Sequence, residues 1–146
     1  MFLQMGGLEI YGVTEIERFD VPLSFMFPEL NDLVTSHEVA ALNDPAVCSN
    51  GQVHLTIRSW LLRMNNRVIL VDGCVGNHKN RKHWPSWHQR TDNVWLKKLG
   101  ALGVKPQDVD VVFCTHLHAD HVGWNTKLEN GHWVPTFSNA TYLTGR

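Results

Sequence analysis

Three histidines and one aspartate fall within six consecutive residues of this chain. They are His116, His118, Asp120 and His121, in the segment FCTHLHADHVGWN. Imidazole and carboxylate groups together suit zinc, iron or manganese as ligands. Four such ligands are more than one open catalytic metal needs, and they are typical of half the ligand set of two metals about 3.5–4 Å apart. This spacing therefore predicts a metal site rather than a merely polar strand end.

The residues before the cluster form an apolar, β-branched run of strand length. VDVVFCT, residues 109–115, is expected to be a strand buried on both faces. Side chains two residues apart in an extended chain point to the same side, so His116 and His118 can converge on one ion. A helical turn after Ala119 would project Asp120 and His121 toward the same cavity. The carboxyl end of a strand is also where α/β proteins place their chemistry.

The other elements alternate between strands and helical or irregular segments, which indicates the α/β class. Asp92 is expected to be the N-cap of a helix over the apolar repeat that follows it. Asn65-Asn66 is a favourable hairpin turn. Residues 20–51 are expected to be a long loop with a helical turn at 36–43. Strands are predicted at residues 7–19, 52–63, 67–72 and 140–144.

Length and composition limit the classes of protein that this chain can represent. Its 146 residues suit a single domain, and a formal net charge of −1 gives no reason to expect nucleic acid or an anionic membrane as a partner. No segment approaches the ~20 apolar residues of a membrane helix. The three cysteines, Cys48, Cys74 and Cys114, are an odd number without a CxxC pair, which favours a reducing compartment. We therefore expect a cytoplasmic protein.

Two segments carry a resemblance to a known family. THLHADHVG at residues 115–123 resembles the signature of the metallo-β-lactamase fold superfamily of metallohydrolases. RVILVDGCVGN at residues 67–77 resembles that superfamily's first motif, a strand that ends in an aspartate, here Asp72. The HVGWN continuation is similar to the branch with lactonase-like and organophosphate-hydrolase-like members. The family usually has a threonine after the aspartate, where this chain has Gly73.

The resemblance implies a role for each residue of the motif. His116 and His118 would serve a first metal, and Asp120 and His121 a second, with a catalytic part for Asp120. Asp72 would hydrogen-bond near the metal loop from outside the ligand set and orient the ligands. Zinc is the expected metal, with iron and manganese as alternatives. The implied reaction is hydrolysis of an ester- or lactone-like bond in a small molecule by hydroxide held at the metals.

The resemblance also implies that part of the usual site is missing. The family fold is an αββα sandwich of two similar halves, a mixed β-sheet with flanking helices in each, and residues 1–146 resemble the N-terminal half as one half-domain. No aspartate follows Asp120, and His132 is the only later histidine, in an expected surface hairpin with Glu129. The chain thus carries four of the usual seven ligands.

An incomplete sandwich would leave one apolar sheet face uncovered, and monomers rarely tolerate such a patch. We expect a homodimer to cover it. A fragment of a longer hydrolase and a second polypeptide that supplies the other half are the alternatives. A non-catalytic, oligomerising metal-binding half-domain is the second functional hypothesis, and a single-metal site shared across a dimer interface is the third.

Aromatic residues near the motif are candidates for the walls of a substrate pocket. Trp84 and Trp87 lie in a basic, aromatic segment at residues 77–90, and Trp124 directly follows the motif. An ordinary solvated loop is the competing interpretation of the segment, and buried packing is the competing interpretation of Trp124. His37 and His54 are assigned to no site.

Overall fold

The computed structural model describes residues 1–28 and 46–145, which form two compact units. Within the described residues, the first unit comprises residues 1–15 and 58–145, and the second comprises residues 16–28 and 46–57. Two long strands, β2 (Leu8–Pro22) and β4 (Gln52–Met64), each contribute to both units. The helical turn expected at residues 36–43 lies outside the described residues.

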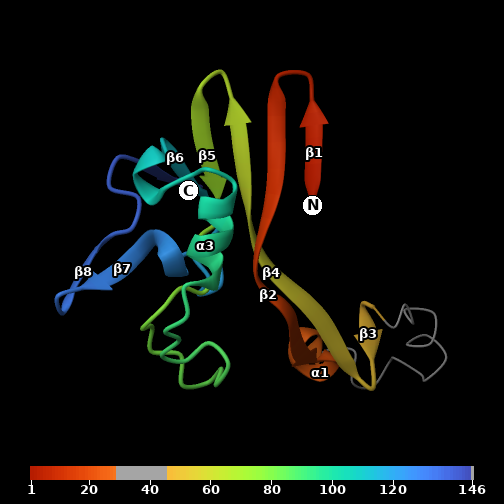
Figure 1. Cartoon of the computed structure of the whole chain (residues 1–146). Coiled ribbons are helices and arrows are strands. Elements are labelled where there is room, and N and C mark those ends of the chain that lie inside the picture. The colour runs from red at the N-terminus through yellow and green to blue at the C-terminus, as the bar shows by residue number, and fades with distance from the viewer. Residues whose placement is uncertain (29–45, 146) are drawn as a thin grey trace. The chain divides into compact units, whose positions relative to one another are not determined.

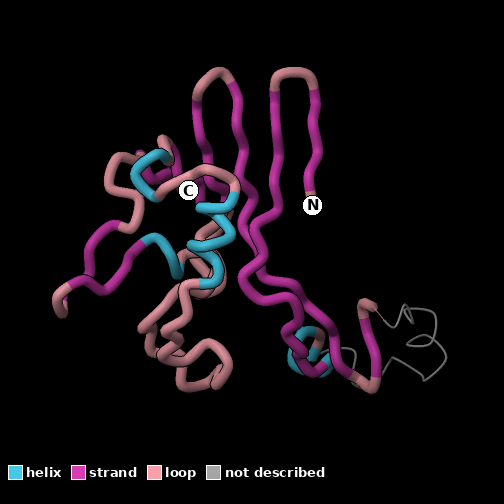
Figure 2. Tube along the Cα trace, viewed as in Figure 1, coloured by secondary structure: helices cyan, strands magenta, loops and turns pink. Residues whose placement is uncertain are grey.

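The strands form a mixed sheet in the order β1-β2-β4-β5-β6-β9, with β3 paired to β4 (Figures 1 and 2). The pairs β1–β2, β3–β4 and β4–β5 are antiparallel, whereas β5–β6 and β6–β9 are parallel. A mixed sheet with few helices confirms the predicted α/β class. The further bounds are β1 Phe2–Met5, β3 Cys48–Ser49, β5 Arg67–Val71, β6 Val111–Cys114 and β9 Thr141–Thr144.

Two hairpins illustrate what local sequence decides. Asn65 and Asn66 both have positive φ, 50° and 61°, and connect β4 to β5 in the predicted hairpin. Two consecutive left-handed residues match the right-handed twist of the flanking strands. Strand β1 was not predicted, although Gly6, with φ 59°, joins it to β2 in a second tight hairpin.

Helix α3 (Val94–Ala101) is the helix predicted after residue 92, but its N-cap is Asn93 rather than Asp92. The Asp92 carboxylate still accepts a hydrogen bond from Val94 N at 3.2 Å, one residue before the cap position. Trp95 is fully buried, and its indole N–H donates to Val13 O at 3.2 Å. This contact fixes α3 against β2.

The two faces of the sheet in the first unit differ in cover. Leu61, Leu70 and Val112 are fully buried on the face that also carries Val13. The prediction that the strand before the motif is buried on both faces was wrong, because Phe113 on the other face is 39% exposed. Six residues of that other face line an apolar hollow of about 410 Å³, which we call the open face: Met1, Leu3, Ile10, Trp60, Leu62 and Val71.

The remaining elements are short. Helix α1 (Leu23–Met26) belongs to the second unit, and strands β7 (Thr126–Glu129) and β8 (His132–Pro135) form a separate antiparallel hairpin. Single 3₁₀ turns cover residues 106–108 and 123–125. In the described part of the chain, no helix combines the length and apolarity required to span a membrane.

Candidate metal centre

The histidines of the motif lie together on the loop that follows β6. The His116 ring lies 4.6 Å from the His118 ring and 3.9 Å from the His121 ring, measured between centroids. His116 and His118 are exposed, whereas Asp120 and His121 are half-buried. The structure therefore brings three imidazoles and a carboxylate to one edge of the sheet.

Asp72, at the end of β5, holds this loop in place. Because β5 and β6 are parallel neighbours, Asp72 lies beside Thr115, whose N–H donates to Oδ1 at 2.8 Å. The other carboxylate oxygen lies 2.8 Å from His121 Nδ1. Asp72 has φ 63°, a left-handed conformation that a residue other than glycine rarely adopts, and such strain is concentrated at functional sites.

The Asp72 contact decides which nitrogen of His121 is available to a ligand. Nδ1–H donates to the carboxylate, so Nε2 carries the free lone pair of the neutral ring. His121 Nε2 lies 3.3 Å from Asp120 Oδ2, so two atoms that can bind a metal lie side by side. This arrangement matches the rule that a carboxylate outside the ligand set orients a metal-binding imidazole.

The donor set fits a divalent metal by its chemistry, since imidazole and carboxylate ligands gather on one loop. Among residues 1–28 and 46–145, however, no three His, Cys, Asp or Glu side chains are arranged to hold an ion as they stand. His116 and His118 are exposed, so their side chains can rotate without repacking a core. His121, anchored by Asp72, is the fixed member around which the others would converge.

Glycines allow the two motif-bearing loops to cross at close range. Gly73 N–H donates to His121 O, and Trp124 N–H donates to Gly73 O at 2.6 Å. A Cβ on Gly73 would lie 2.7 Å from Asn125 Oδ1. A larger residue after Asp72 would therefore have to displace the Asn125 side chain, and its Cβ would lie 3.3 Å from Asn125 N and His121 O.

The tightest crossing involves Gly76 and Gly123. A Cβ on Gly123 would lie 1.8 Å from Val75 O, and Gly76 adopts φ +72° directly beside it. The Gly123 N–H donates to Cys74 O at 2.7 Å. No side chain fits at this crossing, so backbone contact alone sets the distance between the two loops.

Glu15, which was not predicted from the sequence, hydrogen-bonds to both loops of this crossing. This buried carboxylate accepts hydrogen bonds from Val75 N at 2.7 Å, Trp124 Nε1 at 2.9 Å and Gly76 N at 3.4 Å. Burial raises the pKa of Glu15, although these donors oppose the rise. Its partners lie more than fifty residues away, so no local pattern could have indicated its role.

The three tryptophans predicted as pocket walls lie in two places. Trp124 is 2% exposed and stacks on Trp95, with ring centroids 5.5 Å apart. Trp84 and Trp87 pack together at the same centroid distance within the segment 77–90, which is irregular as predicted. Trp87 is buried and Trp84 is half-buried. None of the three lines the open face.

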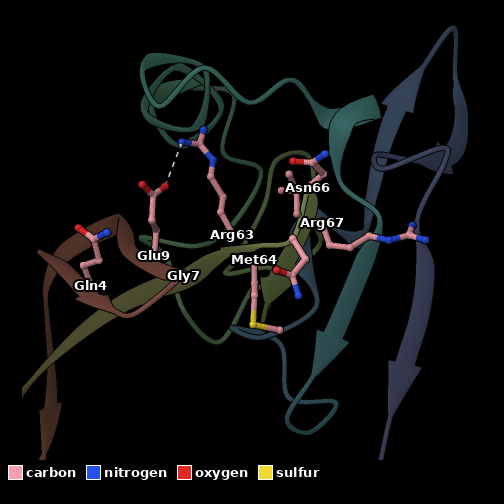
Figure 3. A pocket seen from close by; sticks show the side chains of 9 residues that line it. Gln4, Gly7, Glu9, Arg63, Met64, Asn66 and Arg67 are labelled. Atoms are coloured by element: carbon pink, nitrogen blue, oxygen red, sulfur yellow. Dashed lines mark ion pairs between the residues drawn. The ribbon is translucent and has the colours of Figure 1, made fainter.

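A polar hollow of about 450 Å³ lies at the opposite end of β5 from Asp72. Figure 3 shows Glu9 and Arg63 facing one another across it, with 3.9 Å between their charged atoms. Arg67 extends away from Arg63 and pairs with Asp110 at 2.8 Å. Because this hollow surrounds the hairpin turns, it does not belong to the metal centre.

His132 and Glu129 lie opposite one another at the tip of the β7–β8 hairpin, as expected for a surface turn. On the same hairpin, Trp133 lies under Lys79, whose Nζ is 3.6 Å from the ring centroid. Lys79 Nζ also donates to Thr126 O at 3.0 Å. Burial lowers the pKa of Lys79 to about 8. The segment 77–90 is thus anchored to this hairpin.

Comparison with known proteins places the chain among metallohydrolases. The family model of the metallo-beta-lactamase superfamily matches residues 55–144. A probable metallo-hydrolase of Methanocaldococcus jannaschii is 43% identical over 51 residues, which are 35% of this chain and 21% of that protein. The residues that the family model matches include the motif, the strand before it and the strand that ends in Asp72.

Solved structures resemble nearly the whole chain but are about twice as long. A crystal structure of the hydrolase AbOPH in the beta-lactamase superfamily has a TM-score of 0.68 at 25% identity and covers 97% of this chain and 42% of its own. A probable metal-dependent hydrolase from Staphylococcus aureus has a TM-score of 0.70 at 20% identity, with 96% and 47% covered. The dizinc quorum-quenching lactonase AidC has a TM-score of 0.71 at 20% identity, with 97% and 43% covered. This chain therefore spans less than half the length of these structures.

Proposed function

The chain belongs to the metallo-beta-lactamase superfamily, and from that premise we propose that it acts as a metal-dependent hydrolase at the carboxyl ends of β5 and β6. The observation that carries the proposal is the oriented His121, whose Nδ1 lies 2.8 Å from Asp72 while the His116 ring packs beside it and the His118 ring packs on His116. An ester- or lactone-like bond of a small molecule is the proposed substrate, and zinc is the proposed metal.

The chain's own residues have separate parts in this proposal. His116 and His118 would bind one ion, and Asp120 and His121 would bind a second. Divalent ions in such a site activate water and polarise the bond to be cleaved. Asp72 keeps His121 in the tautomer with Nε2 free, and the Gly76–Gly123 crossing fixes the loop that carries the ligands.

A second function is supported by the ligand count. Within residues 1–146 the candidate ligand cluster contains one carboxylate, Asp120, and these residues span less than half the length of the solved structures that they resemble. Fewer carboxylate ligands would weaken the hold on divalent ions. A non-catalytic metal-binding half-domain, or a single-metal site completed across a dimer interface, is therefore the competing proposal.

Metal analysis of the purified chain separates these proposals. A ratio near two metals per protomer supports the hydrolase, a ratio near one supports the shared site, and a ratio near zero supports the non-catalytic half-domain. Lactone hydrolysis is then measured with and without added zinc or manganese.

The variant His116→Ala/His118→Ala should abolish both metal binding and metal-dependent lactone hydrolysis. His132→Ala is the matched control, since His132 is exposed on the β7–β8 hairpin and lies outside the cluster. Equal lactone hydrolysis by the double variant and the unaltered chain would refute the catalytic proposal.

We also propose that a second copy of this chain covers the open face. The six side chains that line this face are all apolar, and Leu143 continues it beyond Phe113 with which it is in register. Two copies related by a two-fold axis would bury the same surface on each other. A net charge of −1 per chain opposes such pairing only weakly.

Light scattering across micromolar concentrations tests this pairing. Leu3→Ser, at a 51% exposed site on the open face, should shift the mass toward the monomer. Leu128→Ser, at a 40% exposed site on β7, is the control of similar exposure and should leave the mass unchanged. A stable monomer for the unaltered chain would contradict the proposal.

A cytoplasmic location is part of the proposal as well. Cys48, Cys74 and Cys114 are all buried and free, which suits a reducing compartment. Fractionation of cells that produce the protein tests this location.

A further inference from the structure

The second unit carries a row of polar side chains that the metal site does not use. Ser49 on β3, His54 on β4 and Asp20 on β2 project from three neighbouring strands. Ser49 Oγ lies 2.7 Å from His54 Nε2, and His54 Nδ1 lies 2.7 Å from Asp20 Oδ1. A serine, a histidine and a carboxylate thus follow one another at hydrogen-bond distance, which is the arrangement that activates a serine hydroxyl.

Arg18 helps to assign the tautomer of His54. Its Nη2 lies 3.2 Å from His54 Nε2, and a guanidinium can only donate hydrogen bonds. Nε2 therefore accepts, and Nδ1 carries the proton that is donated to Asp20. This is the tautomer in which Nε2 can take a proton from Ser49. Arg18 also bonds Asp20 Oδ1 through Nε at 2.8 Å, which holds the carboxylate toward the ring.

The row is built into the sheet rather than carried on a loose loop. The His54 side chain is only 5% exposed, and His54 N donates to Val47 O at 2.8 Å. Asn50 and Gly51, with φ 51° and 70°, form the two-residue turn that fixes Ser49 opposite β4. Ser49 keeps partial exposure, so a reagent can reach its hydroxyl. Rigid placement of this kind reduces the entropy lost on reaching a reactive geometry.

We propose that Ser49 is a nucleophile, with His54 as its general base and Asp20 as the group that orients His54. Activated esters of carboxylic or phosphoric acids are the reagents that would modify the Ser49 hydroxyl. In this step Ser49 Oγ forms a bond to the acyl carbon or to phosphorus. His54 Nε2 accepts the hydroxyl proton, and the bond to the phenolate or fluoride leaving group breaks. The proton then passes from His54 to solvent.

This site is independent of the proposed metal chemistry. All of its members belong to residues 16–57, and the metal ligands belong to the first unit. Metal removal therefore distinguishes the two proposals, since chelation should stop lactone hydrolysis and leave the reaction of Ser49 unchanged. A merely structural row of hydrogen bonds would stabilise the strands without making Ser49 more reactive than other exposed serines.

The experiment is covalent labelling of the full chain with diisopropyl fluorophosphate in the presence of a chelator, followed by peptide mass spectrometry. A single adduct on Ser49 is expected, and Ser49→Ala should remove it. Ser86 and Ser138, which are exposed, serve as internal controls and should remain unlabelled. His54→Gln should slow labelling about a hundredfold, the size of a typical general-base contribution. Asp20→Asn should slow it at least about tenfold.

Thr56→Val is the matched control variant. Thr56 Oγ1 donates to Glu17 O at 3.1 Å, so this change removes a cross-strand hydrogen bond of the same unit outside the row. Its labelling rate should equal that of the unaltered chain, and circular dichroism checks that each variant is folded. Equal labelling of Ser49, Ser86 and Ser138, or wild-type rates in folded His54→Gln and Asp20→Asn, would overturn the proposal.

Discussion

Two aspartate–histidine pairs in this molecule share one contact and differ in everything beyond it. In the first unit His121 Nδ1 lies 2.8 Å from Asp72, and in the second His54 Nδ1 lies 2.7 Å from Asp20. Both carboxylates thereby fix the tautomer of an imidazole. His121 Nε2, however, faces Asp120 on a loop beside two more histidines, whereas His54 Nε2 faces the Ser49 hydroxyl inside a sheet.

In these two pairs, the group beside the second imidazole nitrogen decides which chemistry the histidine is suited to. A free Nε2 among other imidazoles and a carboxylate is suited to a metal ion, which needs several donors that can adjust. An Nε2 held against a hydroxyl is suited to proton transfer, which needs one partner at a fixed distance. Exposure follows the same division, because His116 and His118 are exposed while the His54 side chain is almost completely buried.

The largest effect is expected from a change at the crossing of the two loops that form the metal centre. Gly123→Ala would place a methyl group 1.8 Å from Val75 O, so the two loops of the metal centre must separate. We expect a loss of about 3 kcal/mol in the free energy of unfolding and loss of measurable metal binding. Urea unfolding and titration with cobalt, followed by its absorption, measure the two effects.

Gly100→Ala in α3 is the control for that change. A Cβ on Gly100 meets no atom within 4 Å, so alanine should instead stabilise the helix by about 0.5–1 kcal/mol. Labelling of Ser49 should continue in both variants, since residues 16–57 form a separate unit. Metal binding by Gly123→Ala at the wild-type level would show that the crossing does not position the ligands.

The next largest effect is expected from replacing one carboxylate oxygen by an amide group in each aspartate–histidine pair. Asp72→Asn should weaken metal binding about 10- to 100-fold, because the amide no longer fixes the tautomer and orientation of His121. Asp20→Asn should slow the labelling of Ser49 and leave metal binding unchanged. Both proteins are assayed for both properties, so each serves as the control for the other.

A crossed result would contradict the comparison directly. If Asp72→Asn slowed the labelling of Ser49, or if Asp20→Asn weakened metal binding, the two pairs would not act separately. Thermal unfolding of each variant distinguishes such coupling from a general loss of structure.

The parts of this molecule that sequence could predict are those decided by neighbouring residues. The Asn65-Asn66 hairpin and the segment of three histidines follow from residues that are adjacent or a few positions apart. The exact N-cap of α3 was missed because the helix begins at Val94, one residue later than expected, so Asn93 holds the cap position although it is the Asp92 carboxylate that accepts from Val94 N. The openness of the sheet at Phe113 depends on what lies across the face, which the strand itself does not encode.

The parts that sequence could not predict depend on pairing across the sheet. His54 gave no signal because Asp20 is 34 residues away, and the strand order alone brings the two together. Glu15 gave no signal because its donors on Val75 and Trp124 are 60 and 109 residues away. In each case a polar residue on a strand could equally have faced solvent, and only the fold distinguishes the two outcomes.

The smallest predicted effect is a difference in pH dependence. The contributions of Glu15 in the first unit and Asp20 in the second to the free energy of unfolding should change with pH in opposite directions. Burial raises the pKa of Glu15, so its contribution to stability is present below the ordinary value of 4.5 and is lost as the pH rises through the folded pKa. The hydrogen bond from Arg18 lowers the pKa of Asp20, so its contribution is present above 3.8 and is lost as the pH falls through the folded pKa.

Urea unfolding between about pH 3 and about pH 7, followed by tryptophan fluorescence, measures these opposite trends. The difference in the free energy of unfolding between the unaltered chain and Glu15→Gln should shrink or change sign as the pH rises. The corresponding difference for Asp20→Asn should shrink as the pH falls. Parallel slopes for the two variants would mean that the two carboxylates have similar surroundings, and the contrast between a carboxylate buried under the metal loop and one exposed beside an arginine would then be wrong.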